Sequence, residues 1–327
     1  MQKLVTIFGG SGFVGRYIAR RMAKQGWRVR VACRRPNEAV FVRMYGAVGQ
    51  VEPVFANIRD DASVAAALSG ADAVVNCVGV LAQSGKNTFD TLQAEGATRI
   101  ARLAAAEGIA NMVQISAIGA DAESRSDYAR TKAEGEAGVM EHQPNAVILR
   151  PSLVFGPEDQ FFNRFAGMAR LAPVLPVVGP NTKFQPVYVD DVAAAAEKAV
   201  IGQAQPGIHE LGGPDVDTFR ELMQTMLRVI RRRALIVTVP FFVARTMAFV
   251  LDWVQKLSFG IVHNGTLTRD QVRNLARDNV VTGQYPGFDV LGIVPSTMET
   301  VLPEYLWRFR PSGQYSDIKD SAKNMKT

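Results

Sequence analysis

The sequence contains little of what metal-binding and disulfide-stabilised proteins need. Among 327 residues there are only two cysteines, Cys33 and Cys77. The three histidines are scattered along the chain, at His142, His209 and His263. No Cys or His spacing matches a metal site, so we expect no bound metal. Each cysteine follows a strand-like run, and the two strands are not expected to be neighbours, so both thiols are predicted to be small core residues in a reducing compartment.

Other absences narrow the class of protein further. No stretch reaches the roughly 18 apolar residues that a membrane-spanning helix needs. Basic residues are not interleaved with aromatic ones and no recognition helix is evident, which argues against nucleic acid as a partner. The chain starts Met1-Gln2-Lys3 and enters a strand-like run at once. We therefore expect no cleaved leader, which favours a bacterial protein over a processed organellar one.

The composition is that of a folded protein with an anionic partner. Hydrophobic residues make up 47% of the chain and charged residues 21%, both ordinary values. The net charge is +6, and the isoelectric point is about 9.4. A phosphorylated cofactor or a membrane surface would match this excess of positive charge.

The first two-thirds of the chain alternates strand-like apolar runs with helical patterns. The strand-like runs are 4–9, 28–33, 51–56, 72–79, 112–117 and 145–151. Helix-like stretches between them include 15–26, 60–70 and 96–108. Strands that are apolar on both faces and are separated by helices predict a parallel sheet covered on both sides. The predicted fold is a Rossmann-type, doubly wound α/β sheet with a smaller C-terminal lobe.

The pattern changes twice after this region. We predict a cofactor-binding domain over 1–225, with inserted lobe segments from about residue 155, where the pattern becomes looser and includes a Gly/Pro-rich loop at 177–186. A C-terminal lobe is predicted over 226–310, and it contains an amphipathic helix at 241–257. The polar stretch 311–327 is predicted to be a mobile tail.

A glycine-rich turn follows the first predicted strand. Gly9, Gly12 and Gly15 are spaced GxxGxxG between a strand and a helix, and Phe13 and Val14 stand between the last two. Such glycines let the backbone approach a diphosphate, and the helix N-terminus offers N–H groups to the anion. The turn therefore predicts a dinucleotide site, and the alternative is a glycine-rich turn without a ligand.

The end of the second predicted strand indicates which dinucleotide binds. An NAD site usually carries an acidic residue about 20 residues after the glycines, to hold the ribose hydroxyls. Here Arg34 lies 19 residues past Gly15, and Arg35 follows it. A guanidinium binds a 2′-phosphate that a carboxylate would repel. We predict NADP(H), and the alternative is two solvated arginines on a loop.

Supporting positions follow the next two strands. Asn57 and Ile58 come after the third strand, where an adenine would lie. Gly79 follows the fourth strand, where a side chain would crowd the cofactor.

Tyr128 and Lys132 are one helical turn apart on the same predicted face. With "GGSGFVG", "LRPSLVFGP" at 149–157, "VYVDDVA" at 187–193 and "HELGGP" at 209–214, this Tyr-x-x-x-Lys pair resembles the atypical or extended short-chain dehydrogenase/reductase superfamily over residues 1–225. The resemblance implies a cofactor site that also includes Val78, Ser116 and Pro151. It further implies that Tyr128 acts as general acid and base, with Lys132 lowering the pKa of its phenol and holding the nicotinamide ribose.

The substrate-activating part departs from the superfamily pattern. Ser116 is present, but the usual catalytic serine lies one or two places later, where Ala117 and Ile118 stand. Gln93 stands where sugar-processing members carry Asn. We therefore expect Tyr128, Lys132 and Ser116 to be vestigial as catalytic groups and to act as cofactor-holding residues without turnover.

One branch of the superfamily keeps the nucleotide site and lets the chemistry lapse. The NADPH-binding accessory subunit of respiratory complex I resembles this chain in the short Ser–Tyr segment, in the length, in "SFGIVHNGTLTRDQVRNLARDNVV" at 258–281 and in "LPEYLWRFRP" near the end. The resemblance implies other complex I subunits as partners. It places the protein peripherally on the cytoplasmic face of a bacterial inner membrane, or on the matrix side of a mitochondrial one.

The residues themselves favour a membrane-edge position. In a helix over 241–257, Arg245, Asp252 and Lys256 form a narrow polar stripe on an otherwise mostly apolar surface. Upstream of it lie four arginines that could meet lipid phosphates, Arg228, Arg231, Arg232 and Arg233. We predict lipid contact through 228–257, and the alternative is a core helix beside a solvated basic turn.

Two other functions remain open. A soluble NADP-dependent reductase or epimerase, acting on a nucleotide sugar or a quinone-like carbonyl, would use Tyr128 as the acid and Lys132 as its partner. An NADPH sensor that changes partner with cofactor state is a lesser alternative. The residues after the fifth strand favour the accessory subunit, whereas the intact Tyr–Lys pair keeps the reductase possible.

Overall fold

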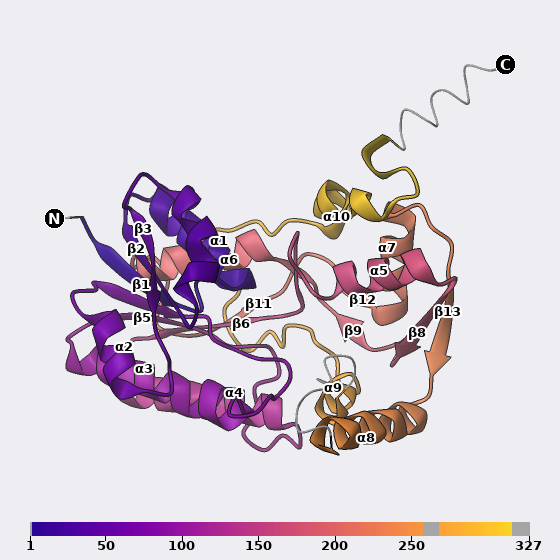
Figure 1. Ribbon diagram of the computed structural model, residues 1–327, viewed down its shortest axis with the longest axis horizontal. Helices are drawn as coiled ribbons and strands as arrows, with labels where there is room; N and C mark the ends of the chain where they lie inside the picture. The colour runs from indigo at the N-terminus through magenta and orange to yellow at the C-terminus, as the bar shows by residue number, and fades with distance from the viewer. Residues whose placement is uncertain (1, 258–267, 316–327) are drawn as a thin grey trace.

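A seven-stranded parallel sheet forms the larger part of the molecule (Figure 1). The computed structural model describes residues 2–257 and 268–315, apart from the side chains of 250–257 and 314. In spatial order the strands are β11 (Gly207–Leu211), β6 (Val147–Pro151), β5 (Asn111–Ile115), β4 (Ala73–Asn76), β1 (Leu4–Phe8), β2 (Arg28–Cys33) and β3 (Val51–Phe55). All neighbouring pairs are parallel. The six predicted strands are all present, and the doubly wound fold is confirmed.

The two cysteines lie on separate strands of this sheet. Cys33 ends β2 and Cys77 follows β4, while β1 lies between these two strands. Both thiols are free and half-buried. The prediction that they do not pair is confirmed.

Helices cover both faces of the sheet, which explains why its strands are apolar on both sides. One face carries α1 (Phe13–Lys24) and α6 (Val189–Val200). The opposite face carries α2 (Asp61–Leu68), α3 (Glu95–Ala106) and α4 (Asp127–His142). The order of elements is that of two βαβ halves that meet between β1 and β4, where the order of strands reverses.

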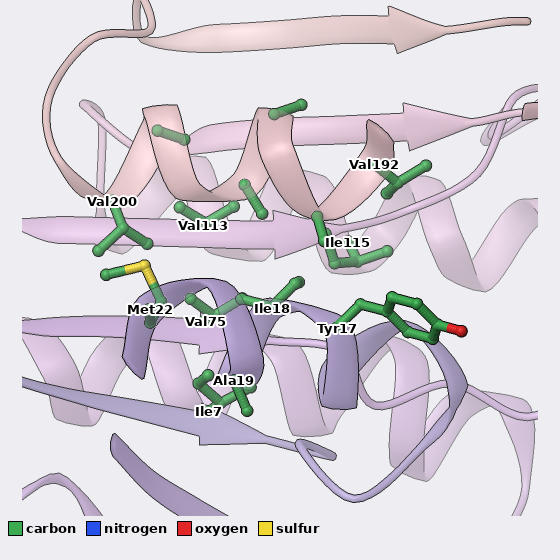
Figure 2. Packing of buried hydrophobic residues seen from close by; sticks show 14 of the residues in the cluster. Ile7, Tyr17, Ile18, Ala19, Met22, Val75, Val113, Ile115, Val192 and Val200 are labelled. Atoms are coloured by element: carbon green, nitrogen blue, oxygen red, sulfur yellow. The ribbon is translucent and has the colours of Figure 1, made fainter. Parts of the chain in front are cut away.

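The core on the α1 side is built from branched aliphatic side chains. Figure 2 shows Ile18 and Met22 of α1 packed close to Val75 and Val113 of the sheet, with Val200 of α6 on the same side. Ile18, Met22 and Val75 have no exposed surface. This packing fixes where α1 begins, and so where the glycine turn lies.

Helices α3 and α4 lie unusually close together because two glycines of α4 face α3. A Cβ on Gly135 would overlap the carbonyl oxygen of Gln93, and a Cβ on Gly138 would overlap the Thr98 side chain. A single π-helical turn, Asp90–Ala94, leads into α3 at this contact. The close approach sets the position of α4, which carries Tyr128 and Lys132.

A second apolar cluster forms a lobe beside the sheet domain. It includes residues of α5 (Phe162–Leu171), β8 (Val174–Val178), α7 (Phe219–Val229) and α10 (Met298–Leu306). The chain also passes back to the sheet domain near residue 290, where Phe288 and Leu291 belong to the first core. The lobe core thus uses chain from about 155 to 230 together with the C-terminal helix.

The remaining elements lie in the sheet domain, as η1 does, or in and around this lobe. They are η1 (Pro36–Tyr45), β7 (Val154–Phe155), β9 (Lys183–Phe184), β10 (Val187–Tyr188), β12 (Asp217–Thr218), β13 (Leu235–Val239), α8 (Phe241–Leu257), α9 (Arg269–Asn274), η3 (Trp307–Phe309) and η4 (Gly313–Tyr315). Strand β13 pairs in parallel with β8, away from the main sheet.

Helix α8 is where the sequence predicted a helix, over 241–257. Its side chains Asp252 and Lys256, two members of the predicted polar stripe, lie outside the described side chains, and most of the predicted tail (316–327) lies outside the described residues. Within the described part of the chain, no helix is long and apolar enough to cross a membrane.

Candidate cofactor and active site

The turn between β1 and α1 is shaped for a close approach of its backbone to a ligand. Gly9 has a φ of +72°, a conformation that suits glycine. A Cβ on Gly15 would lie 2.7 Å from the Cα of Gly10, so no larger residue fits there. Gly12 precedes α1, no side chain caps that helix, and its first turn holds no acidic residue. The turn therefore presents a helix N-terminus to an anion, as the sequence predicted.

Phe13 and Val14 form the first turn of α1 and pack against the core below it. The Phe13 ring meets the Tyr17 ring edge-on, with centroids 6.3 Å apart. A Cβ on Gly156, from the segment after β7, would lie 3.5 Å from the Phe13 ring. Both residues thus border the glycine turn and hold it against the sheet domain.

Arg34 and Arg35 have different partners at the end of β2. Arg34 is exposed, and its Nη1 donates to Asn87 Oδ1 at 3.2 Å. Arg35 pairs with Glu38, 3.1 Å away, on the solvent side. Within the described residues Arg34 has no carboxylate partner, so its charge is available to an anionic ligand.

The two residues predicted to lie near the adenine, after β3, differ in how deeply they are buried. Ile58 is only 6% exposed and packs in the core, against the position that a Cβ on Gly96 would take. Asn57 stays half-buried in the loop, where its Oδ1 accepts the N–H of Arg59 at 3.2 Å. Asn57 is therefore accessible to a ligand at this edge, whereas Ile58 supports the loop from below.

Val78 and Gly79 bring the glycine turn and α4 to one place. A Cβ on Gly9 would lie 3.3 Å from Cγ2 of Val78, and a Cβ on Gly79 would lie 3.3 Å from Nζ of Lys132. The β1–α1 turn, the end of β4 and the middle of α4 thus converge at the carboxyl edge of the sheet. Ligands bind at this edge in open α/β folds.

Tyr128 and Lys132 face one another on α4. The Lys132 Nζ lies 6.0 Å from the centre of the Tyr128 ring and donates to the carbonyl of Ile115 at 3.3 Å. The Tyr128 ring meets the Phe89 ring edge-on at 5.8 Å. Burial, and then the charge of Asp270, raise the pKa of Tyr128 to about 12. Burial lowers the pKa of Lys132 to about 8, against the opposing charge of Glu136. The phenol is therefore neutral at physiological pH.

Ser116 is turned to a buried ion pair. Its hydroxyl donates to Oε1 of Glu136, which lies one helical turn after Lys132. Glu136 also accepts Nε and Nη2 of Arg150 at 2.9 and 2.5 Å. A serine that orients a substrate oxygen must have its hydroxyl available, whereas this hydroxyl is held by the carboxylate. Pro151 ends β6 nearby, and its carbonyl accepts the N–H of Ile118 at 3.0 Å.

Comparison with known proteins agrees with this geometry. The model of the NAD dependent epimerase/dehydratase family matches residues 5–207, which include β1 to β6 and the start of β11. The chain belongs to this family.

Two curated relatives cover most of the chain. The mitochondrial NADH dehydrogenase (ubiquinone) 1 alpha subcomplex subunit 9 of Arabidopsis thaliana is 34% identical over 316 residues, which are 95% of this chain and 79% of that protein. A ceramide reductase of Caulobacter vibrioides is 30% identical over 241 residues, 72% of this chain and 74% of that protein. The resemblance to complex I accessory subunits that the motifs predicted is confirmed.

Solved structures of the family share the fold. The UDP-glucose 4-epimerase of Thermus thermophilus in complex with NAD aligns with a TM-score of 0.67 at 18% identity, and the alignment covers 94% of this chain and 99% of that one. At this identity the likeness concerns the fold alone.

Several side chains at this site were not singled out from the sequence. Glu136 and Arg150 control Ser116, and the helical spacing of Glu136 from Lys132 was the only available signal. Arg59 donates to the carbonyl of Lys86 at 3.0 Å and so holds the loop that carries Asn87. The positions of Arg59 after β3 and Lys86 after β4 were the only sequence signals for this contact near Arg34.

Proposed function

We propose that this chain is an NADPH-binding accessory subunit of respiratory complex I, in which the dinucleotide stabilises the fold and is not turned over. The relatives that cover nearly the whole chain support the complex I assignment. One observation carries the non-catalytic part: a complete glycine turn and Tyr–Lys pair stand beside a serine whose hydroxyl is bonded to Glu136. The site fits the binding of a dinucleotide better than the activation of a substrate.

Arg34 favours NADPH over NADH. Its guanidinium lies at the end of β2, where the ribose of the adenosine half would lie, and its partner is the neutral amide of Asn87. A 2′-phosphate would replace that amide with a charge-assisted hydrogen bond. Such a bond contributes about 1.5–3 kcal/mol, which corresponds to roughly 10- to 100-fold in affinity.

The cofactor supplies binding free energy to the folded state. A ligand at about 100 times its Kd stabilises the fold that binds it by about 2.7 kcal/mol. In the bound protein, Gly9, Gly12 and Gly15 would hold the diphosphate, Arg34 the 2′-phosphate, and Tyr128 and Lys132 the nicotinamide ribose. In working reductases NADPH supplies a hydride. In this chain the groups named above would hold the cofactor.

The second lobe provides a surface for the membrane arm. We define the apolar patch as the exposed side chains of β13 and α8, namely Leu235, Val237, Phe242, Met247 and Phe249. Figure 1 shows β13 leading directly to α8 at one end of the lobe. Three exposed arginines precede the patch, Arg228, Arg231 and Arg233. Large apolar side chains near basic ones suit an anionic lipid interface at the junction of the two arms.

We place the protein at the membrane surface as a peripheral subunit. In a bacterium this is the cytoplasmic face of the inner membrane, and in an organelle it is the matrix side. The patch and the arginines above would form that contact together with neighbouring subunits.

Exchange of one arginine tests the cofactor assignment. We expect Arg34→Met to lower the affinity for NADPH by about 10- to 100-fold and to leave NADH binding unchanged, because only NADPH carries the 2′-phosphate. Arg35→Met is the matched control, since Arg35 pairs with Glu38. Isothermal titration calorimetry measures both affinities. Equal losses for the two cofactors, or a larger loss in the control, would refute the assignment.

A carbonyl reductase is the second candidate function. The intact Tyr128–Lys132 pair and the 30% identity to a ceramide reductase favour it. In that case Tyr128 would donate the proton to the carbonyl oxygen, with Lys132 beside it. Carbonyl-dependent loss of NADPH absorbance that Tyr128→Phe abolishes would support this function over the accessory role.

A further inference from the structure

Helix α9 joins the second lobe to the helix that carries Tyr128. Its Val272 is buried with Ala244 and Ala248 of α8, and its Arg269 lies over the Phe249 ring at 5.6 Å. On its other side α9 reaches the first turn of α4. Figure 1 shows α9 beside α8 and near the N-terminal end of α4. The segment is therefore packed on both parts of the molecule.

The carboxylate of Asp270 accepts three hydrogen bonds from the start of α4. The donors are Ser126 Oγ at 2.8 Å, the backbone N–H of Asp127 at 2.9 Å and that of Tyr128 at 3.3 Å. A helix N-terminus leaves these N–H groups without partners in the helix and attracts negative charge. Asp270 thus caps the tyrosine helix from more than 140 residues away in the sequence.

The neighbours of Asp270 bind the loops on either side of the site. Gln271 donates to the carbonyl of Leu81, in the loop after β4, at 3.4 Å. Arg273 donates to the carbonyl of Arg125 at 2.9 Å, in the loop after β5. Arg277 lies 3.6 Å from Asp121 in that same loop. The segment therefore bridges both loops that leave the carboxyl edge of the sheet next to Tyr128.

We propose that Asp270 is a positioning residue that seats α9 over the outer side of Tyr128, so that this chain itself closes the path of a carbonyl substrate to the tyrosine. In open α/β folds ligands reach the site from outside the carboxyl ends of the strands. The loops after β4 and β5 border that path here, and α9 spans them. Burial, and then the charge of Asp270, raise the pKa of Tyr128, so this contact also favours the protonated phenol.

The same contact links the site to the apolar patch. Because Val272 of α9 packs on Ala244 and Ala248 of α8, the helix of the apolar patch contacts the segment that carries Asp270. The inference rests on the proposed cofactor site for its readout, but it does not depend on which complex the protein joins.

The test measures how easily a small neutral molecule reaches bound NADPH. The full-length protein is loaded with NADPH, and quenching of the nicotinamide fluorescence by acrylamide is recorded. Asp270→Asn removes the charge and keeps the size of the side chain. We expect the quenching constant to rise about tenfold, because bonds to a charged acceptor are lost.

Controls separate this role from a general loosening of the fold. Asp127→Asn removes a half-exposed carboxylate from the same helix end without touching α9, and it should leave quenching unchanged. Asp270→Glu restores the charge and should recover most of the protection. If Asp270→Asn does not fold, Arg273→Met serves instead, since it removes only the bond to Arg125.

The outcomes distinguish this inference from the proposed function. Quenching in Asp270→Asn that equals the wild-type value, with NADPH still bound, would overturn the inference. Equal quenching in Asp127→Asn and Asp270→Asn would overturn it as well. A protein that does not bind NADPH at all would instead contradict the proposed cofactor site. The position of α9 would then be tested by trypsin cleavage after Arg273 and Arg277, which should be faster in Asp270→Asn than in the wild type.

Discussion

At the scale of single residues, one buried carboxylate determines which hydrogen bonds Ser116 forms at the site. Glu136 binds both Ser116 and Arg150, and the side chains of the ion pair are 6% and 12% exposed. It stands one turn from Lys132 on α4, so its charge also favours the ammonium. A hydroxyl that donates to this carboxylate cannot at the same time orient a substrate oxygen. This bond supports the proposal that Ser116 belongs to the scaffold.

Exchange of Glu136 should destabilise the protein strongly. Glu136→Gln leaves Arg150 without its charged partner, and breaking a buried pair costs roughly 3–5 kcal/mol. Glu134→Gln is the matched control on the same helix, because Glu134 forms an exposed pair with Arg130 and should change stability by less than about 1 kcal/mol. Urea unfolding measures both free energies. Similar values for the two variants would show that the Glu136 pair does not hold the fold.

The pKa of Lys132 predicts how cofactor binding depends on pH. Burial lowers its pKa to about 8 in the protein alone. An anionic dinucleotide favours the ammonium form and so raises this pKa on binding. The affinity for NADPH is then highest below about pH 8, where Lys132 is protonated. It falls as the pH rises above that value, by at most about tenfold per pH unit. Titrations from about pH 7 to 9.5 should show this slope in the wild type and not in Lys132→Met; a common slope would argue against it.

At the scale of elements, helix α8 is amphipathic in an unusual sense. Among the described side chains of α8, Ala244 and Ala248 are fully buried against α9 and β8 and Phe241 packs beside them, whereas Phe242, Met247 and Phe249 are exposed by 71%, 50% and 47%. A helix in the centre of a lobe would bury such side chains, whereas these three of the described part of α8 are exposed. We therefore propose that this face of α8 is an interface.

Removal of two exposed side chains tests this surface. Phe242→Ser with Met247→Ser should weaken binding to vesicles of anionic phospholipid more than about tenfold, because each buried side chain contributes about 1.5–3 kcal/mol. Met44→Ser with Val294→Ser is the control, since these residues are also apolar and are exposed outside the patch. Vesicle sedimentation provides the measurement. Unchanged binding of the patch variant would exclude α8 as the lipid contact.

The sequence predicted the elements better than the contacts between them. The alternating strands and helices and the glycine turn are local patterns, so the sheet and the β1–α1 site follow from them. Helix 241–257 was placed with its observed ends for the same reason. The contact of Asp270 with Tyr128 and the bond from Ser116 to Glu136 join distant segments through side-chain placement. No periodicity indicates such pairs, which is why they were missed.

At the scale of the whole molecule, the candidate cofactor site lies where the sheet domain and the second lobe meet. The glycine turn and α4 belong to the sheet domain, while α9 connects α4 to α8 and the lobe. A dinucleotide bound there would stabilise the folded form of both sides of this junction. This coupling is consistent with the proposal that the dinucleotide stabilises the fold.

The most direct test of the accessory role is a mild-detergent pull-down of the tagged chain from membranes of its own organism, with co-eluting proteins and nucleotide identified by mass spectrometry. We expect complex I subunits together with NADPH in a one-to-one ratio to this chain. A protein that elutes without those subunits and exchanges its nucleotide freely would contradict the account.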